Sequence, residues 1–300
     1  MQHLRTISDI PDPNVLRMIM ARASLLKRLR RQGHVPKTLE GRVLAMVFGQ
    51  PSTRTRLSFE SGISMLGGSA VTMQTRDLQL KYGETLRDTA RVMGRYADVL
   101  LLRAKDHEHV ETFAQYAGIP VINGMTAIDH PCQVLTDLFT VFERRENAFD
   151  LQWTWIGPMT STAMGYAGLS AMANINMNFA LPQEDENAKS KLERFIAQGA
   201  PIKMFTDATA AVEDADIVIT DQWPQDSYDE EVRSAFRVSS SLLQGAHDDY
   251  LFLHKLPASR GEEVTEEVLE GRHSVVYEQA GNRLCVQQAI IEWLLDVRLA

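Results

Sequence analysis

The chain has 300 residues, of which 44% are hydrophobic and 23% charged, a length and composition that suit two domains with ordinary hydrophobic cores. Its formal net charge of −8 argues against a nucleic-acid partner, because binding to a phosphate backbone needs a broad basic face. No apolar run is long enough to cross a membrane, and the first residues lack the apolar stretch of a signal peptide, so we expect a cytoplasmic protein with no membrane partner.

Strand-like apolar runs alternate with helical segments along the chain. The first series of strands is expected at 43–48, 70–73, 99–102 and 120–122, and the second at 152–156, 177–181, 202–205, 217–220, 250–253 and 275–277. Such alternation implies parallel sheets covered on both faces, and two series imply two domains. The apolar positions of 134–145 keep a helical period, so a helix should join the domains, and a helix at 282–299 could pack back on the first.

The sequence therefore predicts an α/β protein with two doubly wound domains, each with a parallel sheet, joined by bridging helices. The first domain is expected at residues 1–133 together with a C-terminal helix at about 282–300, and the second at residues 134–281.

Residues 51–56, Pro-Ser-Thr-Arg-Thr-Arg, lie between the first expected strand and a helix indicated by an apolar stripe at positions 59, 62, 63 and 66. A helix N-terminus offers unpaired amides and a partial positive charge, and this one adds hydroxyls and two guanidinium groups. Ser52 or Thr53 could serve only as a cap. However, arginines in the first turn oppose the helix dipole unless an anion compensates them, so we expect a phosphate-like anion to bind here.

Functional side chains also follow other expected strands. Arg103 ends strand 99–102, Asp-His-Pro-Cys-Gln at 129–133 opens the bridging helix, and His-Lys-Leu-Pro-Ala-Ser-Arg-Gly at 254–261 follows strand 250–253. Ligands of open α/β sheets bind at the carboxyl ends of strands, which is where these groups fall. A single histidine before a helix is more often a cap than a catalyst, so the inference depends on the whole set of motifs.

With these motifs the chain resembles the aspartate/ornithine carbamoyltransferase family over almost its whole length. Residues 52–56 are similar to that family's carbamoyl-phosphate signature, 130–133 to its His-Pro-x-Gln motif, and 254–257 to its late His-x-Leu-Pro motif. The ornithine branch is more similar, through Asp-Leu-Gln-Leu at 77–80, Asn-Gly-Met-Thr at 123–126 and Glu-Gln-Ala-Gly-Asn-Arg at 278–283. The resemblance implies a transferase of amino-acid metabolism that uses carbamoyl phosphate and an amine acceptor.

The resemblance also implies roles for individual residues. The phosphate of carbamoyl phosphate would be held by Ser52, Thr53, Arg54 and Thr55. Its carbonyl oxygen would be contacted by Thr55, Arg103 and His130, and its amide by Gln133 and the backbone carbonyl of Leu256. Arg283 would complete the site, and Gln79 would reach in from a neighbouring subunit of a homotrimer. The residues expected to act in catalysis are Arg54, Thr55, Arg103, His130 and Gln133.

The acceptor half departs from the family pattern. Ornithine enzymes carry an Asn-Asn pair where this chain has Gly-Pro-Met-Thr-Ser-Thr at 157–162, and a Ser-Met-Gly where Asp221 and Trp223 are followed by Pro-Gln-Asp. Aspartate enzymes match no better. The expected acceptor-binding residues are therefore Thr162, Asp221 and Lys255.

Lys255 stands where the ornithine enzymes have a cysteine between the histidine and leucine of the late motif. It could be an ordinary solvated lysine. Alternatively, its ammonium group would repel a cationic diamine and favour an acceptor with a carboxylate or another anion. Asp221 would have the opposite effect on acceptor preference, because its carboxylate would attract the second ammonium group of a diamine. This effect would be lost if Asp221 simply pairs with Lys255.

We therefore expect a carbamoyltransferase that acts on an amino acid or a related amine. The alternatives are an ordinary ornithine carbamoyltransferase, which forms citrulline, and a non-catalytic paralogue that binds carbamoyl phosphate. No cofactor or metal is expected: Cys132 and Cys285 lie far apart in the sequence, and the side chains of His107 and His109 would point apart on a helix.

Overall fold

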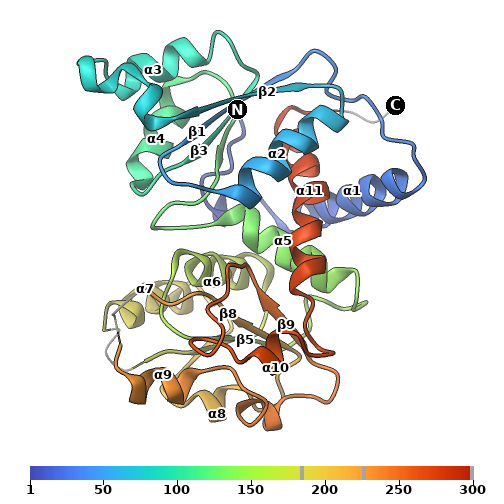
Figure 1. Ribbon diagram of the computed structural model, residues 1–300, viewed down its shortest axis with the longest axis vertical. Helices are drawn as coiled ribbons and strands as arrows, with labels where there is room; N and C mark the ends of the chain where they lie inside the picture. Colours follow the sequence, from blue (N-terminus) through green and yellow to red (C-terminus); the bar gives the residue numbers. More distant parts are fainter. Residues whose placement is uncertain (183–185, 225–227, 298–300) are drawn as a thin grey trace. The chain divides into compact units, whose positions relative to one another are not determined.

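A computed structural model describes residues 1–182, 186–224 and 228–297. The chain divides into two compact units, the first formed by Met1–Phe139 with Asn282–Ala300 and the second by Thr140–Gly281. Each unit is an α/β layer structure built on one parallel sheet (Figure 1). Among the described residues, no helix is long and apolar enough to cross a membrane; a cytoplasmic location stays a prediction.

The sheet of the first unit has four parallel strands in the order β2-β1-β3-β4. Their bounds are β1 Val43–Phe48, β2 Ser69–Gln74, β3 Val99–Arg103 and β4 Val121–Asn123. Strands β1 and β3 are apolar and buried along almost their whole length, as parallel strands covered on both faces must be. The strand order reverses between β1 and β3, where Phe48 pairs with Arg103, so the carboxyl ends of these two strands form the topological switch point.

Helices cover both faces of this sheet (Figure 1). The helices that lie wholly or partly in this unit are η1 Ile7–Asp9, α1 Pro13–Arg31, α2 Thr53–Met65, η2 Thr75–Asp77, η3 Gln79–Tyr82, α3 Leu86–Met93, α4 His107–Tyr116, α5 Pro131–Phe142 and α11 Val276–Leu294. Side chains of α3 and α4, among them Ala90, Met93 and Phe113, join those of Val47 and Leu100 in one apolar cluster. The division between the two units falls within α5 and again within α11.

The sheet of the second unit has five parallel strands in the order β7-β6-β5-β8-β9. Their bounds are β5 Trp153–Ile156, β6 Met177–Ala180, β7 Ile202–Phe205, β8 Ile217–Thr220 and β9 Leu251–His254. The helices of this unit are α6 Ser161–Ala173, α7 Glu186–Ala197, α8 Ala208–Ala211, α9 Glu230–Phe236, η4 Leu242–Gly245 and α10 Glu266–Leu269. The order reverses between β5 and β8, so the loops after these strands are again where a ligand is expected.

The predicted α/β class with two parallel sheets is confirmed, and nine of the expected strands lie within a residue or two of the observed ones. The strand expected at 275–277 is wrong, because helix α11 already begins at Val276 and runs to Leu294. Before it, Ser274 makes only an isolated bridge to Phe252. A short apolar run such as Val-Val-Tyr fits a buried strand and the first turn of a buried helix equally well, which explains the error.

Candidate active site

The loop after β1 and the end of β3 are held together at the switch point of the first unit. The backbone N–H of Gly49 donates to the carbonyl oxygen of Arg103 at 2.7 Å. A Cβ atom at Gly49 would lie 3.3 Å from that oxygen and from Thr75 Oγ1, so a residue without a side chain permits the close approach. The sequence of β1 therefore leads directly into a loop that lies beside Arg103.

Helix α2 starts from this loop with Ser52 as its N-cap, but the Ser52 side chain makes no capping hydrogen bond. The Ser52 hydroxyl therefore does not serve as a helix cap, which was the alternative that the sequence left open. Thr53 is exposed, whereas the side chain of Thr55, also in the first turn of the helix, is buried. The helix thus presents hydroxyl groups and first-turn amides at the carboxyl end of β1, an arrangement that suits an anion.

Three arginines of the first unit gather near this helix end. Burial lowers the pKa of Arg54, and burial together with the charge of Arg54 lowers the pKa of Arg103. The pKa of Arg283 falls to about 10, mainly through burial, while the charges of Arg103 and Arg54 act in the same direction. Arg283 is buried, and Arg54 and Arg103 are partly buried. Cations removed from water that repel one another are costly, and an anion placed among them would relieve this cost.

Arg283 is positioned from the C-terminal helix α11. The helix comes close to α2 at Gly62, where a Cβ atom would lie 3.3 Å from the Gln288 side chain, and Gln288 Nε2 donates to the Gly62 carbonyl at 2.9 Å. Arg283 Nη2 then donates to Thr55 Oγ1 at 2.8 Å, and Nη1 donates to Gln133 Oε1. Residues that the sequence assigned to one site are therefore in direct contact within the first unit.

Gln133 and His130 are placed by the start of α5, whose first residue is Pro131. His130 is buried, with 2% of its surface exposed. The amide nitrogen of Gln133 donates to Asp137 Oδ1 at 2.7 Å, so its oxygen is turned toward Arg283. Sequence reasoning missed Asp137, although the spacing of four residues on an apolar helix was a usable signal.

Arg103 is fixed by a bond from its Nη1 to the carbonyl oxygen of Gly124 at 3.0 Å. Its Nε atom is buried and has no hydrogen-bond partner among the described residues. A buried guanidinium nitrogen without a partner is costly, so it marks a place where a ligand oxygen would be stabilising.

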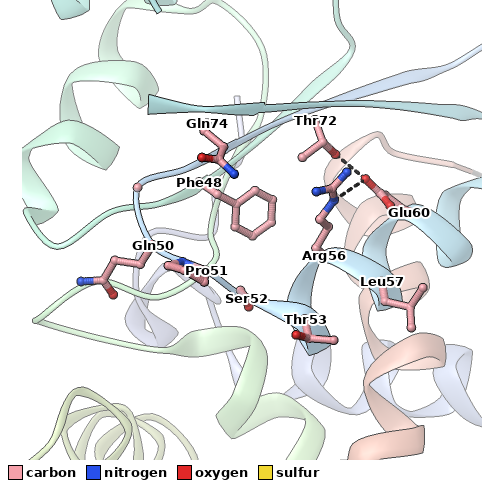
Figure 2. A pocket seen from close by; sticks show the side chains of 11 residues that line it. Phe48, Gln50, Pro51, Ser52, Thr53, Arg56, Leu57, Glu60, Thr72 and Gln74 are labelled. Carbon is pink, nitrogen blue, oxygen red and sulfur yellow. Dashed lines mark hydrogen bonds and ion pairs between the residues drawn. The ribbon is translucent and has the colours of Figure 1, made fainter. Parts of the chain in front are cut away.

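Arg56 differs from what the sequence suggested, because it takes no part in this cluster. Its Nε pairs with Glu60 at 3.0 Å, and Glu60 also accepts a bond from Thr72 on β2 at 2.5 Å (Figure 2). Figure 2 shows this group among the side chains that line a cavity, together with those of Ser52 and Thr53. The volume of the cavity is about 460 Å³. The cavity lies beside edge strand β2, and Leu57, which lines it too, is 62% exposed.

Gln79 lies in the exposed 3₁₀ helix η3 of the same unit. No hydrogen bond joins it to the arginine cluster among the described residues. Its expected role in a neighbouring subunit stays a prediction.

The second unit brings together all three expected acceptor-binding residues. Lys255 Nζ, at the end of β9, lies 2.7 Å from Asp221 Oδ2, at the end of β8. The hydroxyl of Thr162, in the first turn of α6, lies 3.3 Å from Lys255 Nζ and 3.2 Å from Asp221 Oδ2. The Asp221 side chain is 2% exposed and that of Lys255 is 17% exposed. Lys255 is thus a partner of Asp221 and not a solvated surface lysine.

A buried pair that the sequence did not single out holds the same loop in place. His254 Nε2 donates to Glu263 Oε1 at 3.0 Å, and His254 Nδ1 accepts from the backbone N–H of Leu256 at 2.9 Å. The two bonds assign the neutral tautomer with its proton on Nε2. Glu263 also accepts from the Ser259 backbone at 2.7 Å, so the pair fixes both ends of the turn that contains Leu256.

The sequence matches two family models that together cover nearly the whole chain. One is the carbamoyl-phosphate-binding domain of aspartate/ornithine carbamoyltransferases, over residues 2–143, and the other is the aspartate/ornithine-binding domain, over residues 150–294. The chain belongs to the aspartate/ornithine carbamoyltransferase family. It is a carbamoyltransferase with one domain for each substrate.

Individual relatives of this carbamoyltransferase agree with the family assignment. The ornithine carbamoyltransferase of Anoxybacillus flavithermus is 43% identical over 282 residues, which cover 90% of this chain and 89% of the relative. That of Listeria monocytogenes is 40% identical over 276 residues, which cover 88% and 87%. The solved structure of ornithine carbamoyltransferase from Pyrococcus furiosus has a TM-score of 0.91 and 36% identity, and covers 99% of this chain and 98% of its own. The Burkholderia thailandensis enzyme has a TM-score of 0.92 and 35% identity over the full length of both chains.

Proposed function

We propose that this protein transfers the carbamoyl group of carbamoyl phosphate to the primary amine of an amino acid or a related acceptor and releases phosphate. The observation that carries the proposal is the cluster of Arg54, Arg103 and Arg283 at the N-terminus of α2. Burial lowers the pKa of all three guanidinium groups, and repulsion by neighbouring arginines lowers the pKa of Arg103 and Arg283 further. We assign carbamoyl phosphate to residues 1–133 with 282–300, and the acceptor to residues 134–281.

Within this proposal, the first turn of α2 holds the phosphate. The groups assigned to it are those of Ser52, Thr53, Arg54 and Thr55. A dianion there gains the first-turn amides and offsets the repulsion among the buried guanidinium groups. Arg283, which already donates to Thr55, keeps the helix end and the guanidinium cluster in register.

The carbamoyl end of the substrate is assigned to a second set of groups. Arg103, His130 and Thr55 would face the carbonyl oxygen, with the unpartnered Nε of Arg103 as one donor. Gln133 and the backbone carbonyl of Leu256 would face the amide. The oxygen of Gln133 accepts from Arg283 and its nitrogen donates to Asp137, so the amide plane is fixed before any ligand binds.

The chemistry follows from these contacts. The nitrogen lone pair of a deprotonated amine attacks the carbamoyl carbon, the carbonyl oxygen becomes an oxyanion, and the bond to the phosphate oxygen then breaks as the nitrogen loses a proton. Fixed donors such as Arg103 and His130 stabilise that oxyanion, a role worth roughly 3–4 kcal/mol for each donor in other enzymes. Phosphate leaves with the bridging oxygen and stays next to the guanidinium cluster until release.

A protein that only binds carbamoyl phosphate is less well supported. Binding of a phosphate group needs the helix end and the arginines, but not the buried His130 and Gln133 at the start of α5, which are assigned to the carbonyl and the amide. Their retention together with the phosphate residues favours catalysis.

We also propose that the active species is a homotrimer with Gln79 acting in a neighbouring subunit. The support is that β2 is an edge strand with Val71 half exposed, and that the cavity beside it includes Ser52 and Thr53 of the phosphate site. A parallel edge strand next to an open site fits a surface that a second copy covers.

The experiment that tests the proposal is a phosphate-release assay with carbamoyl phosphate and a panel of amines. Ornithine belongs in that panel, because the relatives are named ornithine carbamoyltransferases. At least one amine should accelerate phosphate release above the rate of hydrolysis without acceptor, with one carbamoylated product for each phosphate. Binding of carbamoyl phosphate without acceleration by any amine would favour the non-catalytic alternative.

A further inference from the structure

The carboxylate of Asp221 is saturated by groups of the protein itself. Its Oδ2 atom takes the ion pair with Lys255 at 2.7 Å and hydrogen bonds from the hydroxyls of Thr162 at 3.2 Å and Thr160 at 3.3 Å. Its Oδ1 atom accepts from the backbone N–H of Gln222 at 2.7 Å. Because the side chain is only 2% exposed, an ammonium group from a bound molecule would have to displace Lys255 to pair with it.

Lys255 keeps donor capacity beyond this pair. An ammonium group has three N–H donors, and Lys255 has two partners among the described residues, Asp221 and Thr162. Other polar side chains at the end of β9 and in the loop after it are engaged elsewhere, His254 with Glu263 and Arg260 with Glu270. The remaining N–H of Lys255 suits an oxygen atom of a bound molecule.

We propose that the acceptor of the carbamoyl group is a primary amine that carries no second ammonium group, and that Lys255 sets this preference. The inference rests on the proposed carbamoyl transfer and names its acceptor class. A diamino acid must either place a second cation near Lys255 or break the buried pair, and both are unfavourable. A monoamine with a carboxylate or a neutral oxygen avoids both costs and gains the remaining Lys255 N–H.

Two amines isolate this effect. Ornithine and 5-aminopentanoate share the same carbon chain, reacting amine and carboxylate, and differ only in the second ammonium group of ornithine. We expect the wild-type kcat/KM for 5-aminopentanoate, measured by phosphate release at saturating carbamoyl phosphate, to exceed that for ornithine by about tenfold or more. A higher kcat/KM for ornithine overturns the inference.

A set of variants tests whether Lys255 is responsible. Lys255→Cys leaves Asp221 without its cation, so the kcat/KM ratio should shift toward ornithine by about tenfold. The double variant Lys255→Cys with Asp221→Asn should lose this shift, because nothing remains to pair with the second ammonium group. Lys203→Cys, at an exposed lysine on β7 of the same unit, is the matched control and should keep the wild-type ratio. An unchanged ratio in Lys255→Cys overturns the role of Lys255.

The same measurements separate this inference from the proposed function. The wild-type comparison of the two amines needs no variant, so it decides the acceptor class even if Lys255→Cys does not fold. If wild type transfers the carbamoyl group to ornithine more efficiently than to 5-aminopentanoate, the proposed carbamoyl transfer stands and only the inference about the acceptor class fails. If no amine in the panel accelerates phosphate release, the proposed function fails and the acceptor class fails with it.

Discussion

Arg283 donates a hydrogen bond to the hydroxyl of Thr55, 2.8 Å away, although the two residues are 228 positions apart in the sequence. The C-terminal helix α11 therefore supplies a cation to the N-terminus of a helix near the start of the chain. This contact lies within one compact unit, so the geometry of the phosphate site depends on how α11 packs on α2. A change in either helix should be felt at the site.

Replacement of Arg54 by alanine should weaken binding of carbamoyl phosphate by about 1.5–3 kcal/mol, the cost of a lost charge-assisted hydrogen bond, and by more if the phosphate charge is left uncompensated. Isothermal titration calorimetry measures the effect. Arg56→Ala is the matched control, since Arg56 is two residues away on the same helix but pairs with Glu60. Equal affinities of Arg54→Ala and wild type would show that the phosphate site is assigned to the wrong residues.

The affinity of the site for an anion should fall at alkaline pH. The pKa of Arg283 is lowered to about 10, so this group is cationic below that pH and neutral above it. Because a neutral Arg283 must first take up a proton to attract an anion, affinity for inorganic phosphate should be constant from about pH 8, where phosphate is a dianion, to about pH 9, and should fall by about tenfold per pH unit above about pH 10. Calorimetry from about pH 8 to 11 measures this, with far-UV circular dichroism to verify the fold.

Arg283→Gln provides the control for other groups that titrate in the same range. The variant should bind phosphate weakly throughout, and the part of the pH dependence that belongs to Arg283 should be missing. Parallel pH profiles in the variant and in wild type would assign the dependence to other groups.

The architecture could be predicted from the sequence because parallel strands buried on both faces read as continuous apolar runs. Strands such as Val43–Phe48 and Ile217–Thr220 were expected with their observed bounds. The motifs at the strand ends could also be found in the sequence, because turn residues, helix caps and clustered arginines seldom occur together for structural reasons alone. The start of α11 was misread, since its first apolar residues resemble a buried strand.

The contacts between the motifs could not be predicted from the sequence. Whether Asp221 would serve a ligand or pair with Lys255 depends on how the ends of β8 and β9 approach each other, and only the three-dimensional arrangement places Nζ 2.7 Å from the carboxylate. Likewise, nothing in the motif that contains His254 indicated that Glu263, nine positions later, would be its partner. Partners across a turn of this length follow from tertiary packing.

The proposed trimer predicts that two inactive variants can complement each other. Arg54→Ala and Gln79→Ala should each lose activity, but in mixed trimers some sites combine a wild-type Arg54 from one subunit with a wild-type Gln79 from another. Part of the activity should therefore return when the two proteins are unfolded together and refolded, with mixing verified by mass spectrometry. Verified mixed oligomers that stay inactive would rule out a shared site.

The buried pair of His254 and Glu263 should control the acceptor loop without affecting the phosphate site. Glu263→Ala removes a carboxylate that accepts from His254 Nε2 at 3.0 Å and from the Ser259 backbone at 2.7 Å, which leaves buried donors without partners. We expect the free energy of unfolding to fall by about 2–4 kcal/mol and KM for the acceptor to rise, because the turn with Lys255 and Leu256 loses its support. Urea unfolding and steady-state kinetics measure the two effects.

Glu262→Ala is the control at the adjacent residue, whose side chain is 51% exposed. It should leave the free energy of unfolding and the KM for the acceptor near their wild-type values. Since Glu263 and the arginine cluster belong to different units, affinity for inorganic phosphate, which lacks the amide assigned to Leu256, should stay unchanged in folded Glu263→Ala. A parallel loss of that affinity would contradict a role confined to the acceptor loop.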